Sequence, residues 1–214
     1  PLGIDCLAMP YRSLRDFISA LEEAGQLVRV AAPVSPNLEM TEIQTRLLDK
    51  GGPAVLFEQP TRDDGTVYQM PVLVNLFGTV ERVAMGMGRS ADTLREIGET
   101  LAFLKQPEPP EGLRQTVAML PLIKTVMAMQ PKTIKSAPCQ EVVLRGADID
   151  LGKLPILQHA EGDSGKYITV GCMVIRDPDS GVLNAGIYRH MVQGKDRLGA
   201  MFNPAHHAGY IYRK

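Results

Sequence analysis

Residues 183–192 read LNAGIYRHMV, and after the turn GKD at 194–196 the chain continues as RLGAMF at 197–202. The run YITVGCMVI at 167–175 precedes them, across the segment DPDSG at 177–181. Both connecting segments have the composition of tight turns. Apolar runs joined by tight turns predict an antiparallel meander, so the second half of the chain is expected to open a β-rich domain.

The first half of the chain alternates helical and strand-like patterns. Ser13 is a good helix N-cap, with Asp16 three residues on as in a capping box. The expected elements are helices that begin after Ser13, Asn37 and Ser90, and strands at 27–31, 54–58, 71–76 and 141–144. This alternation predicts an α/β domain through about residue 105 and, with the β-rich second half, an α/β (α+β) fold class.

A cluster of prolines, PEPP at 107–110, marks a domain edge, because proline does not fit inside a helix. We therefore predict a domain at 9–105, a linker with short helices at 106–137, and the β-rich domain at 138–214. Residues 1–8 lack helical or strand periodicity. They are interpreted as a vector-derived or disordered leader, not a signal peptide.

Composition and charge exclude several classes of function. The net charge of −1 lacks the basic excess expected of a nucleic-acid-binding protein. The cysteines, Cys6, Cys139 and Cys172, are too widely spaced for a disulfide framework or a zinc site, which favours a reducing, cytoplasmic location. Cys172 lies within an apolar run and is expected to be buried and inert. No run of about 18 apolar residues is present, so no membrane span is expected.

Polar side chains gather around the predicted hairpin that residues 183–192 begin. Asn184 and Arg189 lie in its first strand, and His206 and His207 follow its second. Amide oxygen and imidazole ligands suit a divalent ion such as Mn²⁺ or Mg²⁺, whereas a guanidinium suits a phosphate or a carboxylate. Each residue also has an ordinary interpretation: an asparagine that bonds its own turn, a solvated strand-end arginine, and a pair of exposed loop histidines.

The spacing of Asn184 and Arg189 poses a geometric problem. Residues five apart on a regular strand point to opposite faces. A shared site therefore requires either a bulge at Gly186 or a cofactor that bridges both sides of the strand end. We expect a local irregularity.

Other polar residues near these segments are expected to be structural or solvated. His159 and His190 have no partner at metal-ligand spacing. The GMG at 86–88 lacks the third glycine and the lysine of a phosphate loop. Acidic residues near the hairpin fall mostly in turns that are expected to face solvent: Glu161, Asp163, Asp177, Asp179 and Asp196.

The chain resembles the UbiD family of prenylated-FMN-dependent decarboxylases in the segments 184–189, 203–207, 78–88 and 138–140. The resemblance implies an N-terminal α/β domain followed by the opening antiparallel strands of a split β-barrel flavin-binding domain. It also implies non-oxidative (de)carboxylation of an aromatic or α,β-unsaturated carboxylic acid. The implied cofactors are prenylated FMN, Mn²⁺ (or Mg²⁺) and K⁺.

The resemblance assigns roles by position. Asn184 and His207 would bind the metal that holds the flavin phosphate, with His207 preferred over His206, and Arg189 would orient the substrate carboxylate. The residues implied to contact the cofactor are Asn184, Gly186, Ile187, Tyr188, Arg189, Met201, Phe202, Asn203, His206 and His207. The family's remaining metal ligand and its catalytic acid, both glutamates, fall beyond residue 214. Residues 1–214 alone are therefore expected to be inactive.

The partners implied by the resemblance are the carboxylic acid and CO₂, a flavin prenyltransferase that supplies the cofactor, and further copies of the chain in a homo-oligomer. Two other functions are compatible with the same residues. One is a split-barrel module that binds ordinary FMN without decarboxylation. The other is a non-catalytic α/β interaction domain in which the polar cluster is incidental.

Overall fold

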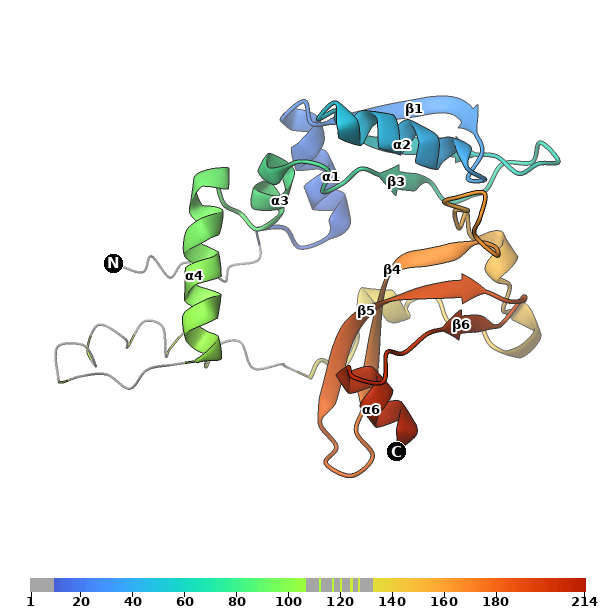
Figure 1. Cartoon of the computed structure of the whole chain (residues 1–214). Helices are drawn as coiled ribbons and strands as arrows, with labels where there is room; N and C mark the ends of the chain where they lie inside the picture. Colours follow the sequence, from blue (N-terminus) through green and yellow to red (C-terminus); the bar gives the residue numbers. More distant parts are fainter. Residues whose placement is uncertain are drawn as a thin grey trace. The chain divides into compact units, whose positions relative to one another are not determined.

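The computed structural model describes residues 10–106 and 133–214, together with the single positions 112, 117, 120, 124 and 127. The chain forms two compact units that are interleaved along the sequence. The first unit comprises residues up to 27 and 77–143, and the second comprises 28–76 and 144–214. Helices and strands occur together (Figure 1), which confirms the predicted α/β class.

The predicted leader and most of the predicted linker lie outside the described residues. The predicted division of the chain between 106 and 137 therefore stays a prediction.

The first unit is helical in its described part. Its elements are α1 (Leu14–Glu23), α3 (Val80–Gly86), η1 (Ala91–Thr93), α4 (Leu94–Lys105) and η2 (Pro138–Gln140). The predicted capping box at the start of α1 is present, since the N–H of Asp16 donates to Ser13 Oγ and the N–H of Ser13 donates to the Asp16 carboxylate. Phe17 of α1 is buried, and its ring centroid lies 4.8 Å from that of Tyr11 and 6.1 Å from that of Phe77.

Helix α3 was missed by sequence analysis. Thr79 caps it by accepting a hydrogen bond from the N–H of Arg82. The GMG at 86–88 is the end of this helix and the turn after it. The strand predicted at 141–144 is wrong, because these residues form bends and irregular backbone and pair with no strand in the part of the chain that the structure describes.

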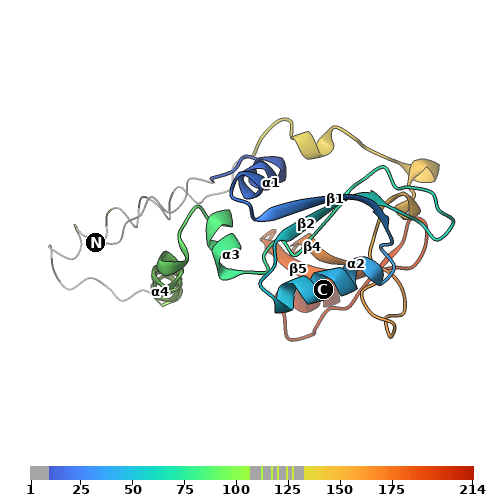
Figure 2. The ribbon, with the colours of Figure 1, turned by 90° about the horizontal axis from the view of Figure 1, so that it is seen from above.

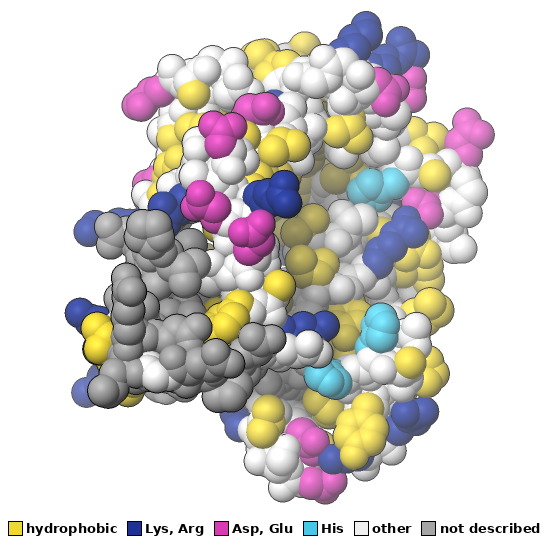
Figure 3. All heavy atoms as spheres, turned by 60° about the vertical axis from the view of Figure 1, so that its left-hand side comes forward, with side chains coloured by type: hydrophobic (Ala, Val, Ile, Leu, Met, Phe, Trp, Pro, Cys, Tyr) yellow, Lys and Arg dark blue, Asp and Glu magenta, His cyan; other side chains and the backbone are white. Residues whose placement is uncertain are grey.

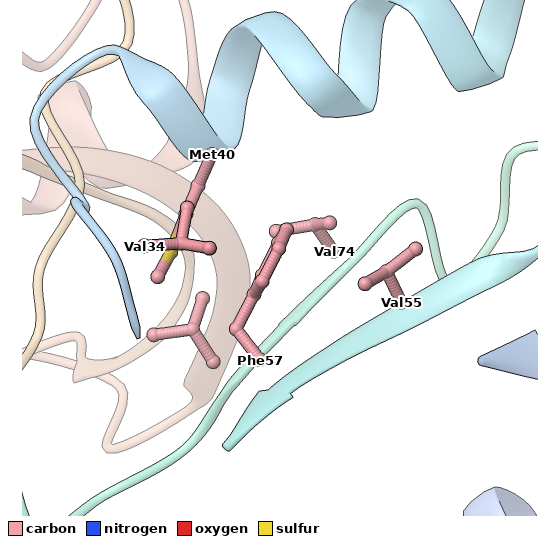
Figure 4. Packing of buried hydrophobic residues seen from close by; sticks show 6 residues of the cluster. Val34, Met40, Val55, Phe57 and Val74 are labelled. Carbon is pink, nitrogen blue, oxygen red and sulfur yellow. The ribbon is translucent and has the colours of Figure 1, made fainter. Parts of the chain in front are cut away.

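The second unit contains a sheet with the order β1-β2-β3. Its strands are β1 (Leu27–Val34), β2 (Ala54–Pro60) and β3 (Val72–Val74), and β1 and β2 run side by side in the view of Figure 2. The core of this unit combines side chains from these strands with Met40 of α2 (Glu39–Asp49), as Figure 4 shows. Its buried members are Val34, Met40, Val55, Phe57, Val72 and Val74.

The start of α2 differs from the prediction. Asn37 does not cap the helix; the N-cap is Leu38, with a φ of 66° and no side-chain capping bond. Backbone carbonyls serve the first helical N–H groups instead, since Glu39 N–H donates to Asn37 at 2.8 Å and Met40 N–H donates to Ser35 at 3.2 Å. The carbonyl of Gln158 also satisfies the N–H of Leu38, so a segment distant in sequence helps to begin this helix.

A second sheet in the same unit has the order β4-β5-β6. Its strands are β4 (Tyr167–Arg176), β5 (Leu183–Val192) and β6 (Leu198–Ala200), preceded by η3 (Gly146–Asp148) and η4 (Leu151–Lys153) and followed by α6 (His207–Arg213). Both strand pairs are antiparallel, which confirms the predicted meander. Helix α6, which sequence analysis missed, packs against β4 and β5.

The segment before β4 joins the two parts of the second unit. The N–H of Gln158 donates to the carbonyl of Pro36, and Leu157 packs against the core around Met40 and Phe57. These contacts explain why residues 28–76 and 144–214 form one unit although they are far apart in the chain.

No described helix has the length and apolar content that crossing a bilayer requires. On the face drawn in Figure 3, basic and acidic side chains are mixed rather than gathered into a patch of one sign.

Candidate functional site

Strand β5 alternates between two faces. The sheltered face carries half-buried or buried residues, namely Asn184, Gly186, Tyr188 and His190, and the open face carries the exposed residues Ala185, Ile187 and Arg189. The expected bulge at Gly186 is wrong, because Gly186 pairs in register with Met173. The predicted metal ligand Asn184 and the predicted carboxylate-binding residue Arg189 therefore lie on opposite faces of the strand.

The irregularity of the hairpin lies in β4 instead. The register shifts after Ile168, so β4 has one extra residue opposite Arg189. Tyr167 then lies opposite Met191, whereas an unbroken register would have placed it opposite Val192, on the sheltered face. The bulge thus brings the ring of Tyr167 to the open face.

Arg189 is held by a carboxylate and an aromatic ring. Its Nη2 donates a 2.7 Å hydrogen bond to Oδ1 of Asp163, and its guanidinium lies 3.8 Å from the centroid of the Tyr167 ring. The side chain of Asp163 is 13% exposed and that of Arg189 is 49% exposed. The hydrogen bond from Arg189 holds the pKa of Asp163 below its usual value, so this carboxylate stays ionised at neutral pH.

The position of Asp163 corrects the expectation of a solvent-facing turn residue. The N–H of Ala160 donates to its Oδ2 at 3.2 Å, which fixes the carboxylate within its own turn. His159 lies in the same turn, and its Nδ1 is buried without a hydrogen-bond partner among the described residues. Burial, followed by the charge of Arg189, lowers the pKa of His159, whereas Asp163 opposes this shift. The imidazole beside the ion pair is therefore neutral at neutral pH.

Sequence analysis did not connect Asp163 with Arg189. The two residues are 26 positions apart and meet only because the turn before β4 folds back against β5. The spacing of the two residues in the sequence does not predict this contact, because the contact depends on the register of the hairpin and on the path of the preceding loop.

Aromatic rings cover the sheltered face of β5. The ring centroid of Phe202 lies 5.4 Å from that of Tyr188 and 5.4 Å from that of Tyr212 in α6. The ring of Tyr188 also lies over Gly186, where an added Cβ would come within 2.7 Å of it. Gly186 thus leaves room for a tyrosine of its own strand, and the three rings connect β5 to α6.

An open hollow of 630 Å³ adjoins these rings. Its lining consists of Met173, His190, Leu198, Ala200, Met201, Phe202 and Tyr212. Small-molecule sites typically measure roughly 300–1,000 Å³ and have mainly apolar walls. The hollow includes two residues that were predicted to contact the cofactor, Met201 and Phe202. It also includes His190, which was predicted to be structural or solvated.

The two histidines of the sequence motif stand at the start of a helix, not in a loop. His206 is the N-cap of α6 and His207 is its first residue, and both are exposed. The other end of α6 is tied to the β4–β5 turn, because Lys214 Nζ lies 2.9 Å from carboxylate oxygens of both Asp177 and Asp179. Hydrogen bonds to Asp179 and Asp177 raise the pKa of Lys214.

The predicted metal pair offers suitable donor atoms. The side-chain amide of Asn184 has no hydrogen-bond partner within the described part of the chain, and its residue lies opposite Ile175, next to the turn that α6 contacts. An amide oxygen and an imidazole nitrogen suit a divalent ion that takes further ligands from phosphate or water. Within the described ranges, no three His, Cys, Asp or Glu side chains gather closely enough to hold a metal ion.

The residues predicted to contact the cofactor are therefore distributed over three places. Asn184, Gly186 and Tyr188 share the sheltered face with Phe202. Ile187 and Arg189 lie on the open face. The rest lie in the segment from the end of β6 to the first residue of α6, at Met201, Asn203, His206 and His207. The Asn203 side chain accepts a 2.9 Å hydrogen bond from the N–H of Ala205.

Gly209 determines how closely α6 approaches the segment before it. It is buried, and an added Cβ would collide with the carbonyl oxygen of Asn203 and lie 3.0 Å from Cα of Pro204. Gly209→Ala should therefore lower the free energy of unfolding by about 1–3 kcal/mol, the usual cost of overpacking. Denaturant unfolding of the full-length protein measures the change.

The matched control is Gly98→Ala in α4, where an added Cβ meets nothing within 4 Å. This substitution should stabilise the protein by up to about 1 kcal/mol, because alanine is the better helix former. Equal effects of the two substitutions would show that α6 is not packed as closely as the structure indicates.

Comparison with protein families gives two matches along the chain. Residues 18–101 match the 3-octaprenyl-4-hydroxybenzoate carboxy-lyase N-terminal domain. Residues 132–214 match the 3-octaprenyl-4-hydroxybenzoate carboxy-lyase Rift-related domain. Both models belong to one family, and together they cover most of the chain.

Solved structures of the same class are similar over almost the whole chain. The UbiD-class enzyme HmfF from Pelotomaculum thermopropionicum in complex with FMN is 31% identical, with a TM-score of 0.70 over 94% of this chain and 38% of that one. An evolved dimeric form of HmfF in complex with prFMN is 31% identical, with a TM-score of 0.71 over 95% of this chain and 41% of that one. Vanillic acid decarboxylase from Sedimentibacter hydroxybenzoicus, in open form, is 27% identical, with a TM-score of 0.65 over 89% of this chain and 36% of that one.

The chain thus spans less than half the length of these relatives. The family matches and the shared fold agree with the resemblance carried by segments 184–189 and 203–207. The chain belongs to the UbiD family of carboxy-lyases and corresponds to the N-terminal portion of its members.

Proposed function

We propose that the protein is a prenylated-FMN-dependent decarboxylase that acts on an aromatic or α,β-unsaturated carboxylic acid. The observation that carries the proposal is the state of Arg189. Its guanidinium is half-exposed and fixed against Tyr167, and its Nε and Nη1 have no hydrogen-bond partner among the described residues. A guanidinium held in this way is suited to bind a carboxylate through its unused donors. Family membership, with relatives solved in complex with FMN or prFMN, supports the cofactor class.

The residues of this chain would bind and orient the reactants. Bound prenylated FMN would supply the electron sink that loss of CO₂ from an unsaturated carbon requires. Asn184 and His207 would hold a divalent ion at the flavin phosphate. Tyr188 and Phe202 would shelter the flavin, and Arg189 would hold the substrate carboxylate in the reactive orientation.

The position of Asn184 and Arg189 on opposite faces favours a ligand that spans the strand. Five residues of a β-strand extend about 17 Å. A flavin mononucleotide has its phosphate at one end and its ring system at the other, so one molecule can approach both residues. Of the two geometries considered from the sequence, we therefore propose the one in which the cofactor reaches both sides of β5.

Further features of the proposal come from the family resemblance. We propose Mn²⁺ or Mg²⁺ as the divalent ion and K⁺ as an additional ion. We also propose a flavin prenyltransferase as the cofactor supplier, CO₂ as the second product or substrate, a homo-oligomeric assembly, and a cytoplasmic location.

The test is to identify the cofactor and the reaction of the full-length protein. The protein is co-expressed with a flavin prenyltransferase, its cofactor is extracted for mass spectrometry, and CO₂ release is measured with hydroxybenzoate- and cinnamate-type acids. We expect the mass of prenylated FMN and CO₂ release that depends on it. Ordinary FMN without any CO₂ release would instead support the flavin-binding module, and absence of both flavin and metal would support an interaction domain.

A further inference from the structure

The contacts of Arg189 point to a second residue that sets the orientation of its guanidinium. Among the described residues, the guanidinium donates one hydrogen bond, from Nη2 to Oδ1 of Asp163, at 2.7 Å. Its Cζ lies over the ring of Tyr167, 3.8 Å from the ring centroid. A planar guanidinium that is bonded at one nitrogen and stacked on one face has little rotational freedom, while its other donors remain available.

Asp163 is itself firmly placed. Its side chain is 13% exposed, and its second oxygen accepts the N–H of Ala160 at 3.2 Å. The N–H of Asp163 in turn donates to the carbonyl of Ala160 at 3.1 Å, which closes a short turn. The carboxylate therefore does not have to be ordered when a ligand arrives, because the backbone of its own turn already holds it.

The bulge in β4 completes this arrangement. Without it, Tyr167 would face the sheltered side of the sheet and would not reach Arg189. The Asp163 carboxylate, which its turn fixes, and the Tyr167 ring, which the bulge reorients, thus both contact the half-exposed guanidinium of Arg189. A surface ion pair formed by chance requires neither feature.

We propose that Asp163 is a positioning residue that fixes Arg189 through one nitrogen, so that the remaining guanidinium donors face an incoming carboxylate. The inference rests on the proposed function for the identity of the ligand, but the contact between Asp163 and Arg189 can be tested without it. Removal of the negative charge would free the guanidinium to rotate. It would not remove the positive charge that attracts the ligand.

The first measurement is independent of activity. The full-length protein is treated with phenylglyoxal, and modification of individual arginines is followed by peptide mass spectrometry. Asp163→Asn should raise the modification rate of Arg189 several-fold, because phenylglyoxal reacts with the terminal guanidinium nitrogens and the Asp163 carboxylate holds Nη2 in a 2.7 Å hydrogen bond. Arg176, whose Nη1 donates to the carbonyl of Gly181 at 2.9 Å, should react at an unchanged rate in the same sample.

The second measurement separates positioning from binding. With an accepted carboxylic acid, Asp163→Asn should lower kcat by about 10–100-fold while KM does not rise, because misplacement of an orienting group by about 1 Å can cost 10²-fold. Asp163→Glu should restore the protection of Arg189 and part of kcat, since it returns the charge. Asp64→Asn is the matched control, because that carboxylate accepts hydrogen bonds from Thr66 and makes none with Arg189.

The results of these measurements either support or overturn the positioning role of Asp163. Unchanged phenylglyoxal reactivity of Arg189 in Asp163→Asn would overturn the proposal, as would a loss of thermal stability that fully accounts for lower kcat. Increased reactivity of Arg189 in a protein that decarboxylates no acid would refute the proposed function and leave the positioning role of Asp163 standing.

Discussion

Arg189→Ala in the full-length protein should lower kcat/KM for decarboxylation by about 10²-fold or more, the cost expected when an orienting group is lost. The reason is geometric as well as electrostatic. Arg189 is the described cation that combines half-exposure with unused donors on the open face of β5. Arg189→Lys should recover only part of the loss, because an ammonium keeps the charge but cannot present two parallel donors or stack on Tyr167 in the same way. Steady-state kinetics, with flavin content measured in every sample, provides the comparison.

Arg176 supplies a matched control for this experiment. It is an exposed arginine on the neighbouring strand, and its Nη1 donates to the carbonyl of Gly181 rather than to a carboxylate. Arg176→Ala should leave kcat/KM near the wild-type value. If Arg189→Ala retained full activity with normal flavin content, the assignment of the carboxylate-binding residue would be wrong.

Asn184→Ala and His207→Ala should each lower metal affinity and flavin retention together. Each removes one ligand from an ion that is proposed to hold the flavin phosphate as well. Loss of an outer-sphere partner of a metal ligand already costs about 10–100-fold in metal affinity, so loss of a ligand should cost at least as much. Metal content by elemental analysis and flavin content by absorbance, in the same purified samples, measure both effects.

His206→Ala is the matched control for His207→Ala, because the two imidazoles are adjacent and both exposed. The structure gives His207 the first position of α6 and leaves His206 as an N-cap without a capping bond. Loss of metal with His206→Ala alone would show that the other imidazole is the ligand. Normal metal content in both the Asn184 and His207 variants would remove the metal site from the proposal.

Local patterns predicted much of the fold. The capping box at Ser13 depends on residues three positions apart, and the meander depends on turn residues between apolar runs. Both features could therefore be predicted from the sequence. The predictions that were wrong concerned features that depend on contacts with other segments of the chain. The run at 141–144 has strand composition but pairs with no strand among residues 10–106 and 133–214. Cys172, expected to be buried, is exposed on β4. Helix α6 was missed because a short helix with two histidines at its start has little periodicity to detect.

Local sequence was enough to predict the candidate site residues, an amide, two imidazoles and a guanidinium near one hairpin, and to indicate the family. Alternation along a regular strand predicts opposite faces for Asn184 and Arg189, but whether a bulge at Gly186 would override it was decided only by the register of β5 with β4. The surroundings of Arg189 became apparent only from the folded chain. A one-residue register shift in β4 places the Tyr167 ring on the same face as Arg189. The turn before β4 places Asp163, 26 residues earlier in the chain, within hydrogen-bond distance of Arg189. Register and loop path arise from packing across the whole unit, so no local pattern in the chain encodes them.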